Sequence, residues 1–99
     1  MFVALSKFEV SNDMERDVKD AFRNRPHSVE NARGFKKLDV ISPLENPKEI
    51  WLITYWLDRE SFETWHKSHL YREAHSGIPK GLKLVPRSPQ LSFFEHVSS

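Results

Sequence analysis

The stretch "IWLITYWL" at residues 50–57 is the strongest secondary-structure signal in the chain. Its residues are all β-branched, aromatic or Leu, a composition typical of a β-strand. Such an apolar run is characteristic of strands covered on both faces. It therefore predicts a strand that is buried on both faces and lies in the centre of a sheet.

Three further strands are predicted by shorter β-rich segments, at residues 2–10, 35–42 and 90–97. Between the first two strands, Met14, Val18, Ala21 and Phe22 recur at helical spacing and form one apolar face. The preceding "SND" offers polar N-caps for this helix. After the central strand, Asp58 is the predicted N-cap of a second helix.

The first helix is expected to kink near its end, because Pro26 pushes Arg25 away from the α region. The following "HSVENARG" predicts one or two further turns that end at Gly34. Residues 82–89 contain two prolines and predict a loop or a short strand.

The resulting order, β–α–β–β–α–β, predicts an α+β fold of the ferredoxin-like, split βαβ type. We expect a single domain over residues 1–99, with a four-stranded antiparallel sheet and both helices on one face. The uncovered face would present either Trp51, Ile53 and Tyr55 or the residues that alternate with them. Because so large an apolar face is not left in water, we expect a homodimer stacked sheet to sheet, a dimeric α/β barrel.

Composition argues against several classes of protein. The chain has 15 basic and 14 acidic residues, so no general basic surface favours nucleic acid. It has no cysteine, which removes disulfides, zinc–thiolate sites and thiol nucleophiles. Neither a G-x-S-x-G nor a G-x-G-x-x-G motif occurs. With no apolar run of about 20 residues and no signal-peptide pattern, we expect a cytoplasmic protein without a membrane partner.

Residues 61–75, "SFETWHKSHLYREAH", combine three histidines with a tryptophan. His75 precedes the loop sequence "SGIP" and is a candidate ligand for the metal of a flat, apolar ligand, because neutral imidazole is a common metal ligand, or else an exposed histidine near a helix C-terminus. Trp65 is a pocket residue or a core residue beside Phe62. His66 and His69 have the spacing of a shared zinc site, but no carboxylate is well aligned to complete it.

Trp65 and His75 would not share a face of a straight helix, because they are about 280° apart around its axis. Both can line one pocket only if the helix breaks between them. The sequence offers Ser68–His69 as the position of this break.

Several of these segments together resemble the antibiotic biosynthesis monooxygenase superfamily. They are the order of elements, "HSVENARGF" before the second strand, "IWLITYW", and F-x-x-W-(x)9-H after it. The resemblance runs from about Phe2 to Val97 and is strongest to the small heme-degrading monooxygenases of bacteria. It implies that Trp65 presses on the porphyrin and that His75 is the axial ligand of the heme iron.

One position departs from that family. The family's asparagine on the first strand, which hydrogen-bonds near the iron on the oxygen side, is replaced here by Ser6. A hydroxyl can still donate, but it is shorter than an amide. We therefore expect heme binding to tolerate this change better than turnover does.

The resemblance implies a heme-degrading monooxygenase in which heme is both substrate and cofactor. Its catalytic residues would be Ser6, Trp65 and His75, and electrons would come from an external donor, a reductase or a small reductant. Phe22 and Arg25 would join Trp65 and His75 in binding heme.

Each of the binding residues also has a simpler interpretation. Arg25, with His27, suits the carboxylates of the heme propionates, or else forms a solvated helix end. Core packing also explains Phe22.

Two other functions remain open, because fold alone does not fix function. One is a cofactor-free monooxygenase acting on a small polyphenolic substrate, and the other is a non-catalytic heme-binding or stress module.

Overall fold

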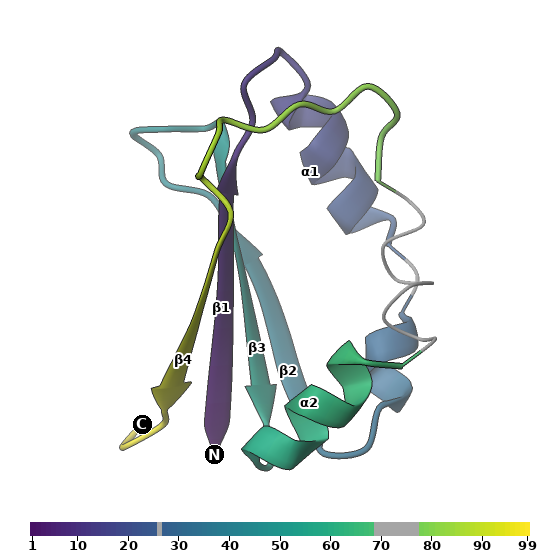
Figure 1. Cartoon of the computed structure of the whole chain (residues 1–99), viewed down its shortest axis with the longest axis vertical. Helices are drawn as coiled ribbons and strands as arrows, with labels where there is room; N and C mark the ends of the chain where they lie inside the picture. The colour runs from purple at the N-terminus through teal and green to yellow at the C-terminus, as the bar shows by residue number, and fades with distance from the viewer. Residues whose placement is uncertain (26, 69–77) are drawn as a thin grey trace.

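The computed structural model describes residues 1–25, 27–68 and 78–99, and the chain forms one sheet with helices on one side of it (Figure 1). The sheet has four antiparallel strands in the order β2-β3-β1-β4. The elements are β1 (Phe2–Glu9), α1 (Glu15–Arg23), the 3₁₀ helix η1 (Ser28–Asn31), β2 (Phe35–Ile41), β3 (Glu49–Trp56), α2 (Arg59–His66) and β4 (Gln90–Glu95). This confirms the predicted α+β, ferredoxin-like class.

The run that predicts the central strand forms β3, which pairs with β2 on one side and with β1 on the other. The prediction that β3 is buried on both faces does not hold within the single chain. Only Ile50 and Trp56 are buried, and the residues between them are half-buried. Trp51, Ile53 and Tyr55 lie on the face opposite the helices, and no described element covers that face.

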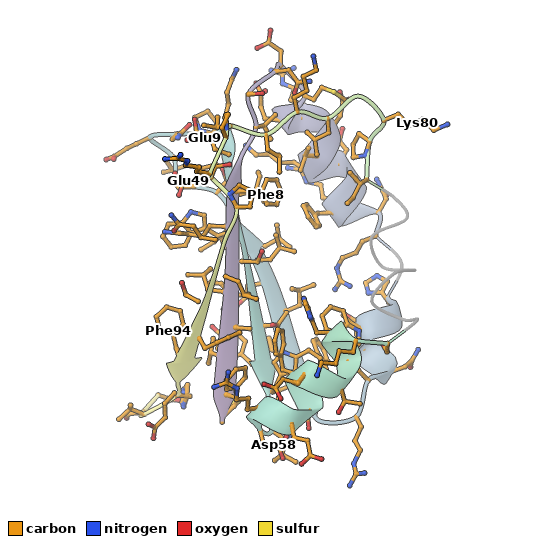
Figure 2. The ribbon with its side chains drawn as sticks, in the orientation of Figure 1. Phe8, Glu9, Glu49, Asp58, Lys80 and Phe94 are labelled. Atoms are coloured by element: carbon orange, nitrogen blue, oxygen red, sulfur yellow. The ribbon has the colours of Figure 1, made fainter. Side chains whose placement is uncertain are left out.

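The core consists of two clusters between the helices and the sheet. The first cluster lies under α2 and is built on Ala4, Val29, Trp56 and Phe62. The second lies under α1 and is built on Val10, Val18 and Ile50. Strand alternation places their strand residues on the helix-facing side of the sheet, whereas Glu49 and Phe94 project from the opposite face (Figure 2).

The N-cap of α2 agrees with the prediction from the sequence, whereas the N-cap of α1 does not. Asp58 is the N-cap of α2, and its carboxylate accepts a hydrogen bond of 2.8 Å from the backbone N–H of Ser61, as predicted. The N-cap of α1, however, is Met14, which makes no capping bond. The predicted polar caps are used elsewhere: Asn12 donates to the carbonyl of Gly81, and Asp13 pairs with Lys48.

The segments that connect these elements agree with the sequence-based predictions in part. Helix α1 ends at Arg23, before Pro26, and the further turns predicted after it form η1. Residues 82–89 form no named strand, and Leu84 makes an isolated bridge to Val10. Within the described parts of the chain, no helix is long and apolar enough to cross a membrane.

Candidate functional site

The middle of the helix-facing side of the sheet is less buried than its two ends. At the ends, Ile50 and Trp56 are fully buried beneath the two core clusters. Between them, Ser6, Leu52 and Thr54 are only half-buried. The sheet therefore keeps a partly accessible strip between α1 and α2 that carries two hydroxyl groups and one leucine, and we call Ser6, Leu52 and Thr54 the central strip.

Ser6 lies on this strip, because it alternates along β1 with Ala4 and Phe8, which pack in the core clusters. It stands opposite Leu52 of β3 and Leu91 of β4. Its hydroxyl makes no hydrogen bond to any residue that the structure describes. The hydroxyl is thus available to a bound ligand.

Trp65, in the last turn of α2, is half-buried and packs against the first core cluster. Its ring centroid lies 5.4 Å from that of Trp56, with an angle of 37° between the planes. Helix α2 ends at His66, slightly earlier than the predicted break. Trp65 therefore belongs to the core, as its simpler interpretation predicted, and also reaches the surface at a helix end.

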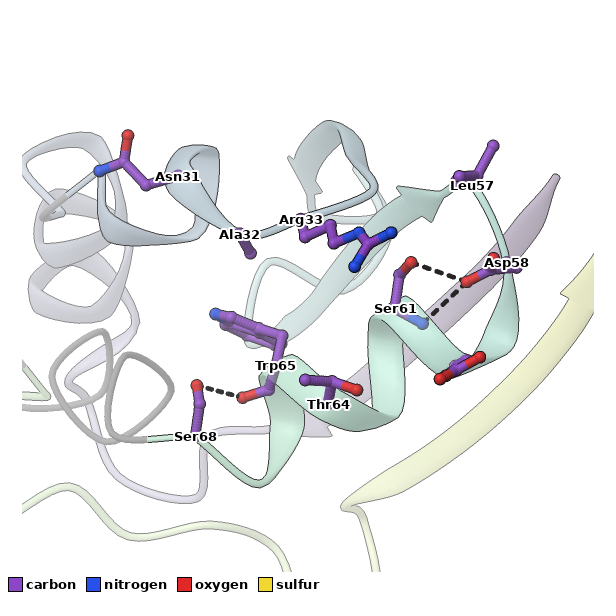
Figure 3. Close-up of a pocket in the computed structure, with 10 residues that line it drawn as sticks. Asn31, Ala32, Arg33, Leu57, Asp58, Ser61, Thr64, Trp65 and Ser68 are labelled. Carbon is purple, nitrogen blue, oxygen red and sulfur yellow. Dashed lines mark hydrogen bonds between the residues drawn. The ribbon is translucent and has the colours of Figure 1, made fainter.

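Beside Trp65 there is a pocket of about 320 Å³ between the 31–33 segment and α2 (Figure 3). Its wall carries Arg33, Thr64 and several hydroxyl groups. The Ser61 hydroxyl donates to Asp58 over 2.7 Å, and the Ser68 hydroxyl donates to the carbonyl of Trp65 over 2.6 Å. The pocket combines one aromatic ring with polar groups, a combination suited to a small ligand.

Arg25 follows α1, and its side chain is mostly buried, with 19% exposed. Its guanidinium donates to both carboxylate oxygens of Glu30, at 2.6 and 3.4 Å. This hydrogen bond lowers the pKa of Glu30 below its ordinary value of 4.5. His27 also lies 3.4 Å from Glu30 but is largely exposed. A carboxylate ligand would therefore share Arg25 with Glu30 or displace it.

Of the other predicted residues, the structure describes Phe22 and His66 but not His69 and His75. Phe22, on α1, is half-buried against the second core cluster. His66 stacks on Phe62 with 5.4 Å between ring centroids. His69 and His75 lie outside the described residues, so the iron ligand and the zinc alternative stay predictions. Among residues 1–25, 27–68 and 78–99, no three histidine or carboxylate side chains are grouped as metal ligands.

Two residues that matter to this region were missed from the sequence. Glu30 lies on η1 and pairs with Arg25 at a separation of five residues, which is not the i, i+4 spacing of a helical ion pair. Trp56, at the end of β3, contacts Trp65. In the sequence, its face of the sheet follows only from strand alternation, because alternate residues of β3, such as Leu52, Thr54 and Trp56, share one face.

The fold and the central strip define a ferredoxin-like α+β protein with a candidate ligand site between its helices and its sheet. The sequence profile of the antibiotic biosynthesis monooxygenase family matches residues 1–77. The chain belongs to this family.

Individual relatives include proteins that act on or bind heme. The chain is 27% identical over 63 residues to the heme oxygenase (mycobilin-producing) of Mycobacterium tuberculosis; the alignment covers 64% of this chain and 60% of that protein. The structure of the heme degrader MhuD from the same species, with two hemes in its active site, matches with a TM-score of 0.80 and 24% identity, covering 100% of this chain and 98% of that one. An MhuD variant with two manganese protoporphyrins per site matches with a TM-score of 0.81 and 23% identity, covering 100% and 97%. At these identities the structural matches establish the fold.

Proposed function

We propose that this member of the family is a heme-degrading monooxygenase. One feature of the fold supports this function most directly. The half-buried central strip lies between the helices that carry Phe22 and Trp65, and the hydroxyl of Ser6 on it has no partner among the described residues. The curated relative is a heme oxygenase, and two of the matched structures hold porphyrins.

The described residues fit a flat, apolar, dianionic ligand. Leu52 offers apolar contact in the middle of the strip, and Phe22 and Trp65 offer aromatic contact on its two sides. Arg25 supplies a guanidinium for a propionate, in exchange with Glu30. His75 would hold the iron, as the sequence predicts, through a neutral imidazole.

In this proposal heme is the substrate and is opened with dioxygen and electrons from an external donor, a reductase or a small reductant. When bound, its iron supplies the oxygen chemistry, and the protein supplies orientation and polarity. His75 would hold and orient the bound group. The Ser6 hydroxyl would offer a hydrogen-bond donor to developing negative charge. Trp65 would pack on the macrocycle and exclude water.

A second function is favoured by the pocket beside Trp65. Its volume of about 320 Å³ and its mixture of one indole with hydroxyl groups suit a small aromatic substrate with several hydroxyls. This would be the chemistry of a cofactor-free monooxygenase of the same family. In a third possibility the chain binds heme without degrading it.

The uncovered sheet face also supports a homodimer. Apolar side chains that are not fully buried lie at its middle and at one end, namely Leu5, Ile53, Tyr55 and Phe94. Towards its other end, Lys7 lies over the Trp51 ring at 4.6 Å, and the Trp51 N–H donates to Glu49 over 2.6 Å. A twofold axis would bury the apolar part of one copy against that of the other.

The test follows the Soret band of the hemin-loaded protein under ascorbate. Catalase is present, because free peroxide would otherwise bleach heme without the enzyme. Decay of the band together with released iron supports heme degradation. A stable band despite tight binding would leave a heme-binding module, and no hemin binding would favour the cofactor-free alternative.

A further inference from the structure

Trp56 is the most completely enclosed aromatic residue of the first core cluster. It closes β3 and is 0% exposed. The edges of two phenylalanine rings meet it almost at right angles: Phe35 at 5.5 Å and 81°, and Phe62 at 5.9 Å and 75°. Two such contacts from different elements leave the Trp56 ring little freedom to turn.

Trp65 lies against this ring at 5.4 Å and is half-buried, whereas Trp56 is fully buried. Helix α2 is eight residues long and ends one residue after Trp65. The carbonyl of Trp65 is held by the backbone N–H and the hydroxyl of Ser68, at 2.9 and 2.6 Å. These bonds fix the backbone but not the side-chain torsions. The orientation of the Trp65 ring therefore depends on what it packs against.

The residue type at position 56 is also informative. The indole N–H of Trp56 is buried and has no hydrogen-bond partner among the described residues. Burying an unpaired donor is unfavourable, and a phenylalanine would avoid it. A phenylalanine ring is narrower than an indole and would offer Trp65 a smaller surface than the one it meets at 5.4 Å.

We propose that Trp56 is a positioning residue that sets the orientation of the Trp65 ring. This proposal rests on the proposed heme-degrading function for its effect on turnover. Under that function, Trp56 does not touch the substrate and acts on it through Trp65. Replacing Trp56 should then impair ring opening more than heme binding.

The first experiment is a double-mutant cycle of W56F and W65F on the rate of Soret decay. We expect W56F alone to slow decay about tenfold, with hemin affinity changed by less than about threefold. In the W65F background, W56F should change the rate by less than about twofold, because the ring that it positions is gone. V10A is the matched control for a core defect, since Val10 is fully buried in the second cluster; it should lower the melting temperature without changing the rate.

The second experiment needs no heme. Protein labelled with fluorotryptophan gives one fluorine signal for each of Trp51, Trp56 and Trp65, assigned by single Trp→Phe variants. W56F should shift or broaden the Trp65 signal and leave that of Trp51, on the other face of the sheet, in place. If W56F does not fold, F35L removes one of the contacts that fix Trp56 and should move the Trp65 signal as well.

An unchanged Trp65 signal in W56F, or in F35L where W56F does not fold, overturns the positioning role. So does a cycle in which the two substitutions slow decay independently. If the protein neither binds nor degrades hemin, the proposed function fails, and the fluorine signals still decide whether Trp56 orients Trp65.

Discussion

Ser6→Asn tests the oxygen side of the proposed site. Ser6 lies in the middle of β1 on the helix-facing side of the sheet, half-buried and with no described partner for its hydroxyl. Asparagine would carry an amide donor further from the backbone into the same space. Because the position is partly open, the larger side chain should fit without displacing Leu52 or Leu91, its cross-strand neighbours.

The expected gain in the rate of Soret decay can be estimated from the strength of one hydrogen bond to developing negative charge. Removing one well-placed donor to a developing negative charge costs about 2.7–4 kcal/mol in buried active sites. Ser6 is half-buried and already offers a hydroxyl, so we expect a gain nearer to ~1.4 kcal/mol, which is about tenfold in rate. Hemin affinity should change little, since in the proposed complex His75 and apolar contacts, and not Ser6, would hold the ring.

The assay compares Soret decay under ascorbate and catalase for wild type, Ser6→Asn and Ser92→Asn. Ser92 is a matched control because it is also half-buried on a strand but belongs to the opposite face of the sheet, across from Leu5. Only Ser6→Asn should accelerate decay. Equal rates in all three proteins, or equal acceleration by both substitutions, would contradict a donor role for position 6.

Three further outcomes follow from the packing, the ion pair and the uncovered face. Phe62 is 5% exposed and contacts the rings of Phe2 and Trp56. Phe62→Ala should therefore cost about 3–5 kcal/mol and lower the melting temperature by roughly 15–25 °C in a thermal scan. The bond from Arg25 lowers the pKa of Glu30, so this ion pair stabilises the fold above pH 4.5 and is lost as pH falls through the lowered pKa. The melting temperature of Glu30→Gln should thus fall less on acidification below pH 4.5 than that of wild type, and equal losses would exclude the pair as a source of stability. Light scattering should give about twice the chain mass of 11.7 kDa for wild type and the single mass for Ile53→Lys, and a wild-type monomer would contradict the sheet-to-sheet dimer.

Local signals in the sequence predicted the elements well. The apolar run at residues 50–57 gives β3, and Asp58 gives the cap of α2, because strand composition and capping act over a few neighbouring residues. The predicted α1 cap was wrong: the N-cap is Met14, and Asp13, one residue earlier, pairs with Lys48, a residue distant in sequence. Within the single chain β3 is not buried on both faces. The composition of an apolar strand does not indicate whether the same chain supplies the layer that covers its second face.

The candidate site could be predicted only in part. Ser6 and Trp65 could be chosen through the family resemblance, and alternation then places Ser6 on the helix-facing side. The pairing of Arg25 with Glu30 and the contact of Trp65 with Trp56 depend on side-chain packing between separate elements. No periodicity in the sequence encodes such contacts, so they became visible only in three dimensions.

The most direct test of heme binding through His75 is a hemin titration of wild type, His75→Ala and His66→Ala. An imidazole bound to heme iron shifts the Soret band, and removing it should abolish the shift or weaken binding strongly. His66→Ala should behave nearly as wild type, because His66 is exposed and stacks on Phe62. We predict a saturable Soret shift that is lost with His75 alone. A shift that survives in His75→Ala, or that is absent from wild type, would contradict the account.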